Sequence, residues 1–245
     1  MWDVNNCRVL HDFPGQGGFV YAIALSPDGT TLASAHQDGC VRIWDLTNIG
    51  KRSDSPGLIS VKHHGDDEVV SVCYSPDGKC VASGSARGAA KLWSLTAPEP
   101  LMSLPGQGGK IHRLAFSPDG SLIAAAVGDR LVILWDANTG AVIHTLAGHS
   151  RAAMSLAFSP DGKRLASGGD DQIIKLWDTL TGEESVTLKG HRDSVTCLAF
   201  SPDGRRLASA SDDWTVTLWN ATPSTTDPAS PGPSVKSLEG NDPSP

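Results

Sequence analysis

The fold is decided by the stretch from Ser159 to Trp177, which reads SPDGKRLASGGDDQIIKLW. The tetrapeptide Ser-Pro-Asp-Gly occurs five times, and a tryptophan follows the serine of each copy 18 residues later. The five stretches are Ser26 to Trp44, Ser75 to Trp93, Ser117 to Trp135, Ser159 to Trp177 and Ser201 to Trp219. The copies are 42 residues apart three times and 49 residues apart once, where a polar stretch over 48–57 is inserted. A fixed period of this length predicts an array of equal structural units.

Each unit reads as four short antiparallel strands. The first, such as Phe19–Leu25 or Val195–Phe200, is largely apolar, which favours a strand covered on both faces. Ser-Pro-Asp-Gly then forms a turn, because proline presets φ, aspartate bonds its own backbone and glycine accepts a positive φ. The second strand is exemplified by 206–209, the third by Thr215–Trp219 and the fourth by Ser185–Leu188.

The composition of the chain argues against several classes of function. The 245 residues carry a net charge of −7 with scattered basic residues, which disfavours nucleic acid as a partner. No stretch is apolar enough to span a membrane. The five cysteines have no CxxC spacing and read as reduced core thiols, so we expect a cytoplasmic protein.

The units resemble WD40 repeats. The Trp-Asp dipeptide stands at Trp44-Asp45, Trp135-Asp136 and Trp177-Asp178, and Gly-His at Gly148-His149 and Gly190-His191. Two copies depart from the pattern with Trp93-Ser94 and Trp219-Asn220. The resemblance implies an all-β propeller with five four-stranded antiparallel blades.

Alignment of the copies predicts the repeat boundaries. They are a remnant fourth strand in 1–14, repeat 1 in 15–63, repeat 2 in 64–105, repeat 3 in 106–147, repeat 4 in 148–189, repeat 5 in 190–240 with a flexible 221–233, and a tail in 241–245. The N-terminal strand either closes a five-bladed ring against the Trp219 strand, or the chain forms an open arc of a larger ring. We favour the arc, which would expose the apolar sides of its end blades and promote self-association.

The resemblance also implies a buried hydrogen-bonded tetrad of histidine, serine, aspartate and tryptophan in each blade. Two copies match fully, His149, Ser167, Asp171, Trp177 and His191, Ser209, Asp213, Trp219; the first has Gln16, Ser34, Asp38 and Trp44. In repeat 3 Gln107 is present but Ala125 replaces the serine, and in repeat 2 Gly65 and Arg87 replace histidine and aspartate, although His64 is adjacent. We therefore expect repeat 2 to be the least stable.

A Ser/His/Asp set also invites a catalytic interpretation. Because the set recurs in several units and is covered by a tryptophan, we interpret it as structural. The paired acids Asp170-Asp171 and Asp212-Asp213 could suggest a metal site, but one member of each pair belongs to a tetrad. The sequence predicts no enzyme, no metal and no cofactor.

In the family, partners usually bind the face formed by the turn entering the first strand and the turn after the second. Carrying those positions over gives Phe19, Tyr21, Gln37, Glu68, Lys110, His112, Met154, Asp170, Thr196 and Asp212 as candidate partner-binding residues. Trp214 is added because nothing in the repeat plan requires it, either as a solvent-facing anchor or packed against a neighbouring strand or the tail.

The leading hypothesis is a non-catalytic scaffold that presents one face to a protein or peptide. One alternative is a sensor or regulatory segment of a longer signalling protein. Another is a small-ligand or enzymatic propeller that uses its central channel.

Overall fold

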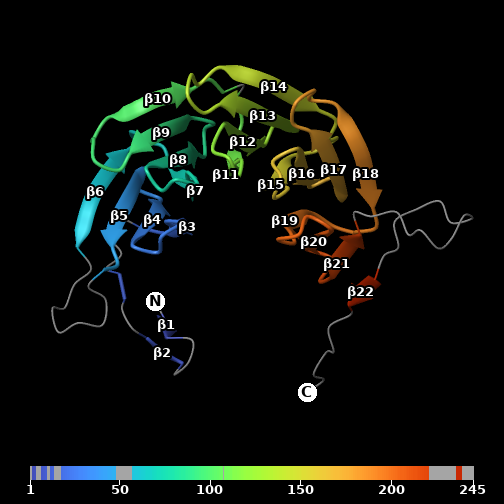
Figure 1. The fold of residues 1–245 in the computed structure, drawn as a ribbon, viewed down its shortest axis with the longest axis horizontal. Helices are drawn as coiled ribbons and strands as arrows, with labels where there is room; N and C mark the ends of the chain where they lie inside the picture. The colour runs from blue at the N-terminus through green and yellow to red at the C-terminus, as the bar shows by residue number, and fades with distance from the viewer. Residues whose placement is uncertain are drawn as a thin grey trace, which may run out of the picture. The chain divides into compact units, whose positions relative to one another are not determined.

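The computed structural model of the 245-residue chain describes residues 2–3, 7–9, 12–13, 18–47, 57–106, 108–220 and 236–238. Every regular element in these ranges is a β-strand. The strands form five four-stranded antiparallel sheets and one two-stranded sheet, as Figure 1 shows. The chain divides into two compact units, Met1–Leu114 and Ala115–Pro245. The prediction of an all-β chain of four-stranded antiparallel sheets is confirmed.

Each sheet is built from consecutive strands, and we number the sheets as repeats 1 to 5. Repeat 1 contains β3 (Val20–Leu25), β4 (Thr31–His36), β5 (Cys40–Asp45) and β6 (Leu58–His63). Repeat 2 contains β7 (Val69–Tyr74), β8 (Cys80–Ser85), β9 (Ala90–Ser94) and β10 (Pro100–Leu104). Repeat 3 contains β11 (Ile111–Phe116), β12 (Leu122–Val127), β13 (Leu131–Asp136) and β14 (Val142–Ala147).

The last two sheets follow the same order. Repeat 4 contains β15 (Ala153–Phe158), β16 (Arg164–Gly169), β17 (Ile173–Asp178) and β18 (Glu184–Lys189). Repeat 5 contains β19 (Val195–Phe200), β20 (Arg206–Ser211), β21 (Val216–Asn220) and β22 (Lys236–Leu238). Near the N-terminus, β1 (Trp2–Asp3) pairs with β2 (Arg8–Val9).

The Ser-Pro-Asp-Gly turn joins the first two strands of each sheet in the way its chemistry predicts. In repeat 4 the Ser159 hydroxyl donates to Asp161 at 2.6 Å and accepts the Arg164 amide at 2.9 Å, while Gly162 takes a φ of 69°. These bonds close the turn from inside, because a buried hydroxyl satisfies both a carboxylate and a backbone N–H. The hydrogen bonds from the Ser159 hydroxyl and the Lys163 amide lower the pKa of Asp161.

The core lies between neighbouring sheets rather than within one. In the first unit, Ala33, Val41 and Ile43 of repeat 1 pack against Val69 and Val72 of repeat 2. Analogous clusters in the second unit join repeat 3 to repeat 4 and repeat 4 to repeat 5. Each sheet therefore depends on a neighbour to bury its apolar face, as expected of a repeat protein.

Two expectations about burial were wrong. The first strand of repeat 1 is not covered on both faces, because Val20, Ile23 and Leu25 are 49%, 66% and 57% exposed. The cysteines are all free thiols, but Cys7 and Cys197 are exposed and only Cys40 is buried. A periodic pattern identifies a strand, but it does not tell whether a second sheet lies against it.

The two ends of the chain add strands to the pattern. At the C-terminal end, β22 pairs with β21 and supplies the fourth strand of repeat 5. At the N-terminal end, the paired strands β1 and β2 lie within 1–14, where the remnant fourth strand was predicted. The segment 221–233, predicted to be flexible, lies outside the described residues.

Candidate functional site

The most regular polar feature is a buried chain of hydrogen bonds in repeats 4 and 5. In repeat 4, Nε2 of His149 lies 2.8 Å from Oγ of Ser167, which also accepts the indole N–H of Trp177 at 2.8 Å. Nδ1 of His149 lies 3.0 Å from the Asp171 carboxylate. The serine hydroxyl thus lies between a ring on each side and satisfies both.

Repeat 5 reproduces this arrangement with the equivalent residues. The distances are 2.9 Å from His191 Nδ1 to Asp213, 2.7 Å from His191 Nε2 to Ser209 and 2.8 Å from Trp219 Nε1 to Ser209. The four residues come from the turn before the first strand, the second strand, the following turn and the third strand. The chain of bonds therefore fixes two turns against two strands of the same sheet.

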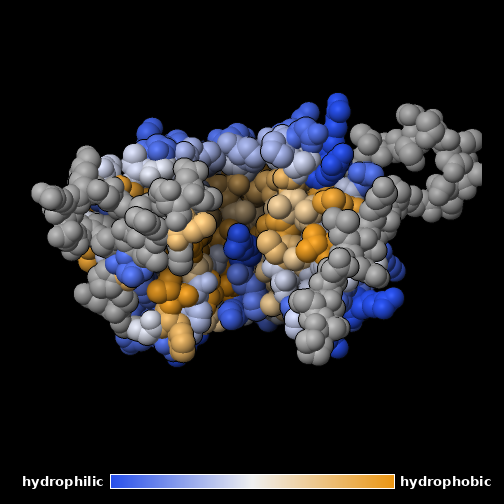
Figure 2. Space-filling view, turned by 90° about the horizontal axis from the view of Figure 1, so that it is seen from below, coloured by the Kyte–Doolittle hydropathy of each residue, from blue (hydrophilic) through white to orange (hydrophobic). Residues whose placement is uncertain are grey.

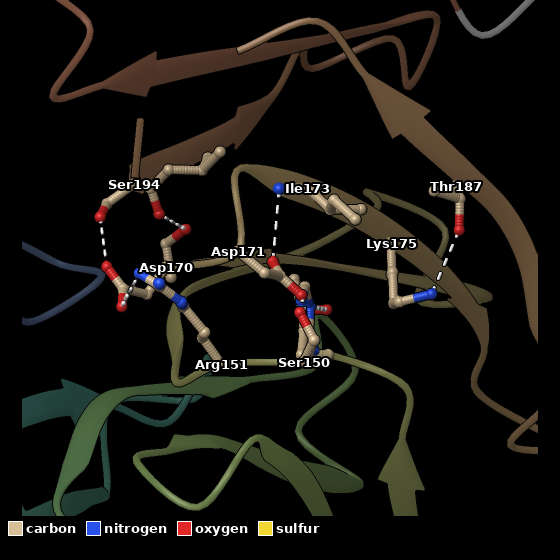
Figure 3. Close-up of polar contacts among 12 residues, drawn as sticks. Ser150, Arg151, Asp170, Asp171, Ile173, Lys175, Thr187 and Ser194 are labelled. Carbon is tan, nitrogen blue, oxygen red and sulfur yellow. Dashed lines mark hydrogen bonds and ion pairs between the residues drawn. The ribbon is translucent and has the colours of Figure 1, made fainter. Parts of the chain in front are cut away.

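The aspartates of these sets also accept backbone amides. Asp171 accepts the amides of Ser150 at 2.8 Å and Ile173 at 3.3 Å, as Figure 3 illustrates. Burial alone would raise the pKa of Asp213, but hydrogen bonds from Thr215, the Arg192 amide and His191 lower it well below its usual value. A carboxylate engaged in this way is a structural anchor for a loop.

The same geometry closes the serine off from a substrate. Ser167 has no exposed surface, and His149 and Trp177 are both buried. A hydrolytic serine has to reach a carbonyl carbon from an open face, beside donors for the oxyanion. The Ser167 hydroxyl instead contacts the His149 and Trp177 rings, so the arrangement supports a structural hydrogen-bonding role.

Repeat 2 obtains its histidine from a position that the alignment did not give. His64, one residue before the aligned Gly65, places Nε2 against Oγ of Ser83, which also accepts the Trp93 indole N–H at 2.6 Å. Its Nδ1 is buried without a hydrogen-bond partner, since Arg87 stands at the position of the aspartate. Burial lowers the pKa of His64 to about 4.

Repeat 1 differs from the expected set more strongly. Ser34 accepts the Trp44 indole N–H at 2.8 Å, but its other ring partner is His36, two residues further along β4. Asp38 pairs with the Arg42 guanidinium and leaves the imidazole alone. Nδ1 of His36 is buried without a partner, and burial lowers the pKa of this histidine. Gln16 and the repeat 3 residue Gln107 lie outside the described residues.

The alternation of side chains along a strand could have found His36. Residues two apart on a strand point to the same face, so Ser34 and His36 are natural neighbours. His64 stands next to the aligned Gly65 in the sequence, and a shift of the histidine by one residue brings it to the serine. Neither signal has the fixed spacing that identifies the histidines of repeats 4 and 5.

In the first unit, four of the candidate partner-binding residues form one connected group, which we call the Tyr21 cluster: Phe19, Tyr21, Gln37 and Glu68. The Tyr21 hydroxyl donates to Glu68 at 3.0 Å, and the Gln37 amide donates to the same carboxylate at 3.3 Å. The Phe19 amide donates to the Gln37 side chain at 3.3 Å. Loss of hydration and the bond to Glu68 raise the pKa of Tyr21, which keeps the phenol protonated as a donor.

The aromatic rings of the Tyr21 cluster remain open to solvent. Phe19 is 69% exposed and Tyr21 is 42% exposed, with ring centroids 6.4 Å apart. The carboxylate comes from the turn before β7 and the rings from the start of β3, so the cluster joins repeat 1 to repeat 2. The Tyr21 cluster therefore combines two exposed aromatic rings with a hydrogen-bonded group of Tyr21, Gln37 and Glu68.

In the second unit, the candidates Asp170 and Asp212 both approach Ser194. The Ser194 hydroxyl donates to Asp170, whose other oxygen lies 3.7 Å from Arg151 (Figure 3). The Asp212 amide donates to the Ser194 carbonyl at 3.0 Å. This group is polar and joins repeat 4 to repeat 5, whereas the Tyr21 cluster is largely aromatic.

The structure places the remaining candidates on separate strands and turns. Lys110 is exposed and His112 half-buried at the start of β11, Met154 is half-buried on β15, and Thr196 is exposed on β19. Trp214 is 97% exposed in the turn between β20 and β21, so it does not pack against a neighbouring strand.

Trp214 also has an unusual backbone. Its φ of 67° lies in the left-handed region, as do those of Gly39, Gly88, Arg130 and Gln172 at the same position of the other repeats. Two glycines at this position fit that requirement without strain, whereas a tryptophan takes a cost of about 1 kcal/mol. A large side chain is therefore held in water on a turn that would be more stable with glycine.

Two further properties of the described residues bear on function. No group of three or more His, Cys, Asp or Glu in the described part of the chain could hold a metal ion. The same ranges contain no helix long and apolar enough to cross a membrane.

Together the features define a class: a repeat protein whose units are four-stranded blades, each held by a buried tryptophan. A family model described as the IFT122 first beta-propeller matches residues 110–235, which is more than half of the chain. A second model, described as WD domain, G-beta repeat, matches residues 7–45 and 57–94. The chain belongs to the WD40-repeat β-propeller family.

Curated relatives match over short stretches. Small ribosomal subunit protein RACK1z of Oryza sativa subsp. japonica is 42% identical over 60 residues, which is 24% of this chain and 18% of that protein. RACK1y of the same plant is 43% identical over 47 residues, covering 19% and 14%. Small ribosomal subunit protein RACK1 of Caenorhabditis elegans is 41% identical over 51 residues, covering 21% and 15%. The matched stretches span less than a fifth of each of these relatives.

Proposed function

We propose that this protein is a non-catalytic scaffold that holds a protein or peptide partner, and that the Tyr21 cluster is its contact surface. Family membership makes a protein-interaction role the general expectation. The observation that carries the proposal is the exposed pair of Phe19 and Tyr21, in which the Tyr21 hydroxyl is held by a hydrogen bond to Glu68. Aromatic side chains held rigid at the surface lose little entropy on binding and often provide most of the binding energy.

The chemistry of the cluster indicates what it would recognise. The two rings offer an apolar contact, and the Glu68 carboxylate already accepts two hydrogen bonds from Tyr21 and Gln37. A partner segment with apolar side chains and few acidic ones fits best, because added negative charge beside Glu68 would be repelled. In the other unit, Trp214 offers a further exposed aromatic side chain.

We propose the cytoplasm as the compartment of this protein. All five cysteines are free, although Cys7 and Cys197 are exposed to solvent. Exposed thiols persist unpaired in a reducing environment, which favours the cytoplasm.

A peptide selection tests the contact surface. The wild-type chain is used to select binders from a displayed library of random peptides, and the binders are measured again with Tyr21→Ala and Phe19→Ala. We expect each alanine to weaken binding by at least tenfold, because truncating an aromatic hot-spot residue costs about 2 kcal/mol or more.

Two matched variants serve as controls for the alanine substitutions. Tyr21→Phe keeps the ring and removes the bond to Glu68, so it should weaken binding less than Tyr21→Ala does. Leu180→Ala removes another exposed apolar side chain, 87% exposed on the turn after β17, and should leave binding unchanged. Equal affinities for wild type, Tyr21→Ala and Phe19→Ala would exclude the Tyr21 cluster.

A further inference from the structure

The internal junctions show what normally covers the first strand of a repeat. In repeat 2, Val69, Val72 and Tyr74 are 0%, 7% and 9% exposed, because they pack on the sheet of repeat 1. In repeat 5, Val195 and Leu198 are likewise 0% and 7% exposed against repeat 4. The covering surface in repeat 1 consists of alanines of β4 and branched residues of β5, namely Ala33, Ala35, Val41 and Ile43, all without exposed surface.

Repeat 1 presents the same first-strand surface without such a cover. We call Val20, Ile23 and Leu25 of β3 the N-side face; they stand at the positions of Val69, Val72 and Tyr74 in repeat 2. Their exposed fractions are 49%, 66% and 57%. Such exposed fractions are typical of surface residues, although residues at these positions are buried at the junction between repeats 1 and 2.

Repeat 5 presents the complementary surface. We call Ala208, Ala210, Val216 and Leu218 of β20 and β21 the C-side face; they stand at the positions of Ala33, Ala35, Val41 and Ile43. Val216 is 48% exposed and the other three are half-buried, whereas their counterparts in repeat 1 are fully buried. Figure 2 shows hydrophobic residues open to view on the side of the molecule that it draws.

The chain thus carries both halves of the junction that it uses internally. We propose that the N-side face of one molecule binds the C-side face of a second copy, in a head-to-tail association. The occupant is argued from the internal junctions, where an Ala-Ala-Val-Ile surface covers a Val-Val-Tyr surface in the same order. Repeats 4 and 5 pack in the same way, with Ala166 and Ile174 against Val195 and Leu198.

An internal polar contact gives the register that the proposed association would have. At the junction of repeats 4 and 5, the Ser155 hydroxyl on β15 donates to the Val195 carbonyl on β19 at 3.1 Å. The position of Ser155 in repeat 5 is Cys197, which is exposed, and the position of Val195 in repeat 1 is Val20. The proposal therefore places Cys197 of one copy beside Val20 of the next.

A heterologous contact of this kind is not symmetric, so it predicts specific behaviour on mixing. Each molecule offers one face of each kind, and copies add until a ring closes or a chain grows. A charge on either face blocks only that face, because an unpaired carboxylate cannot be buried against apolar side chains without a large cost. Two variants blocked at opposite faces still have one intact pair between them.

The test uses the full-length chain. Sedimentation velocity over a hundredfold range of concentration is run on the wild type, Ile23→Glu, Val216→Glu and a mixture of the two variants. We expect the wild type to form dimers or larger species, each variant to be monomeric, and the mixture to form a dimer and nothing larger. Leu180→Glu, which adds a charge at an exposed apolar residue that belongs to neither face, should associate like the wild type.

Cross-linking separates the possible occupants of the two faces. Under mild oxidation, Val20→Cys in a Cys7→Ser background should form a disulfide with Cys197 of another molecule and run as a dimer or a ladder. A disulfide that closes within one molecule would overturn the second copy as occupant, and so would a wild type that stays monomeric throughout. The proposal would also be overturned if Ile23→Glu abolished association while Val216→Glu still associated like the wild type, because that result would indicate contact between two N-side faces. Far-UV circular dichroism verifies that each variant retains its sheet content.

Discussion

Single residues decide how firmly each repeat is held, and Ser167 is the clearest example. Its hydroxyl accepts the Trp177 indole N–H and lies 2.8 Å from the His149 ring, all of it buried. Removing it leaves two buried ring nitrogens without partners. An unsatisfied buried donor or acceptor costs about 1–3 kcal/mol.

We therefore expect Ser167→Ala to lower the free energy of unfolding by about 1–3 kcal/mol. Urea unfolding followed by tryptophan fluorescence measures the change. Ser150→Ala is the matched control, since Ser150 contributes its backbone amide to Asp171 and its hydroxyl is not needed for that bond. Equal losses in the two variants would show that the Ser167 hydroxyl does not contribute to stability.

His64 makes stability depend on pH. Its pKa is about 4 in the folded chain, against 6.5 in the unfolded chain. Between these values the unfolded chain binds the proton and the folded chain does not, so acidification favours unfolding. We expect stability to fall from pH 6.5 to pH 4, by on the order of 3 kcal/mol from this group.

Urea midpoints at several pH values for wild type and His64→Gln measure this contribution. The wild type should lose stability more steeply than the variant over that window. His36 acts in the same direction in both proteins, because burial lowers its pKa as well. Parallel curves for the two proteins would show that His64 does not carry the dependence.

The histidines also show how far the sequence predicts this site. Repeats 4 and 5 keep the family spacing, so their four residues could be assigned by position alone. His64 is displaced by one residue and His36 lies on the strand itself, so the family spacing does not identify either histidine. Each of them nevertheless contacts the serine that binds the tryptophan of its repeat. The sequence shows which groups have to be satisfied, but not which neighbour satisfies them once the motif drifts.

At the scale of strands, close packing between sheets limits the side chains that fit. Gly168 on β16 faces Val195 of the next repeat, and a Cβ added there would come 2.6 Å from the valine side chain. The equivalent residue of repeat 5 is Ala210, which is half-buried on the C-side face. The same position of the repeat is therefore closely packed at Gly168 and partly exposed to solvent at Ala210.

We expect Gly168→Val to destabilise the protein by about 1–3 kcal/mol, because the added side chain overpacks the junction. Ala210→Val adds a similar volume on the open face and should change stability by less than about 0.5 kcal/mol. Thermal unfolding at a concentration where the chain is monomeric compares the two. A cost for Ala210→Val equal to that of Gly168→Val would mean that the C-side face is covered within the molecule.

Strand positions were predictable from sequence, whereas their environments were not. The turn chemistry of Ser-Pro-Asp-Gly and the apolar runs locate β3 to β21 within a residue or two, because those signals are local. The exposure of β3 could not be read in this way, since its residues are as apolar as those of β7. Whether a strand is covered depends on a distant part of the chain.

At the scale of the whole molecule, stability should vary from repeat to repeat. Repeat 4 has a complete set of four residues, whereas repeat 2 has a histidine with an unpaired nitrogen and no aspartate. In a repeat array, each unit contributes its own stability plus that of its junctions. Units can therefore open separately from one another.

Native-state hydrogen exchange tests this ordering. We expect the amides of β8 and β9 in repeat 2 to exchange faster than those of β16 and β17 in repeat 4. Pairs of strands at equivalent positions are compared so that exposure to solvent is similar. Stronger protection in repeat 2 than in repeat 4 would mean that the buried polar set does not govern local opening.

The serine of the repeated turn has a consequence for modification. Each repeat contains a serine followed by proline, which is the sequence that proline-directed kinases phosphorylate. In the folded chain Ser117 and Ser159 are 1% exposed, and both hydroxyls donate to the aspartate of their own turn. Such a kinase would have access to these two residues only before the chain has folded, and a phosphate placed there would keep the turn from closing.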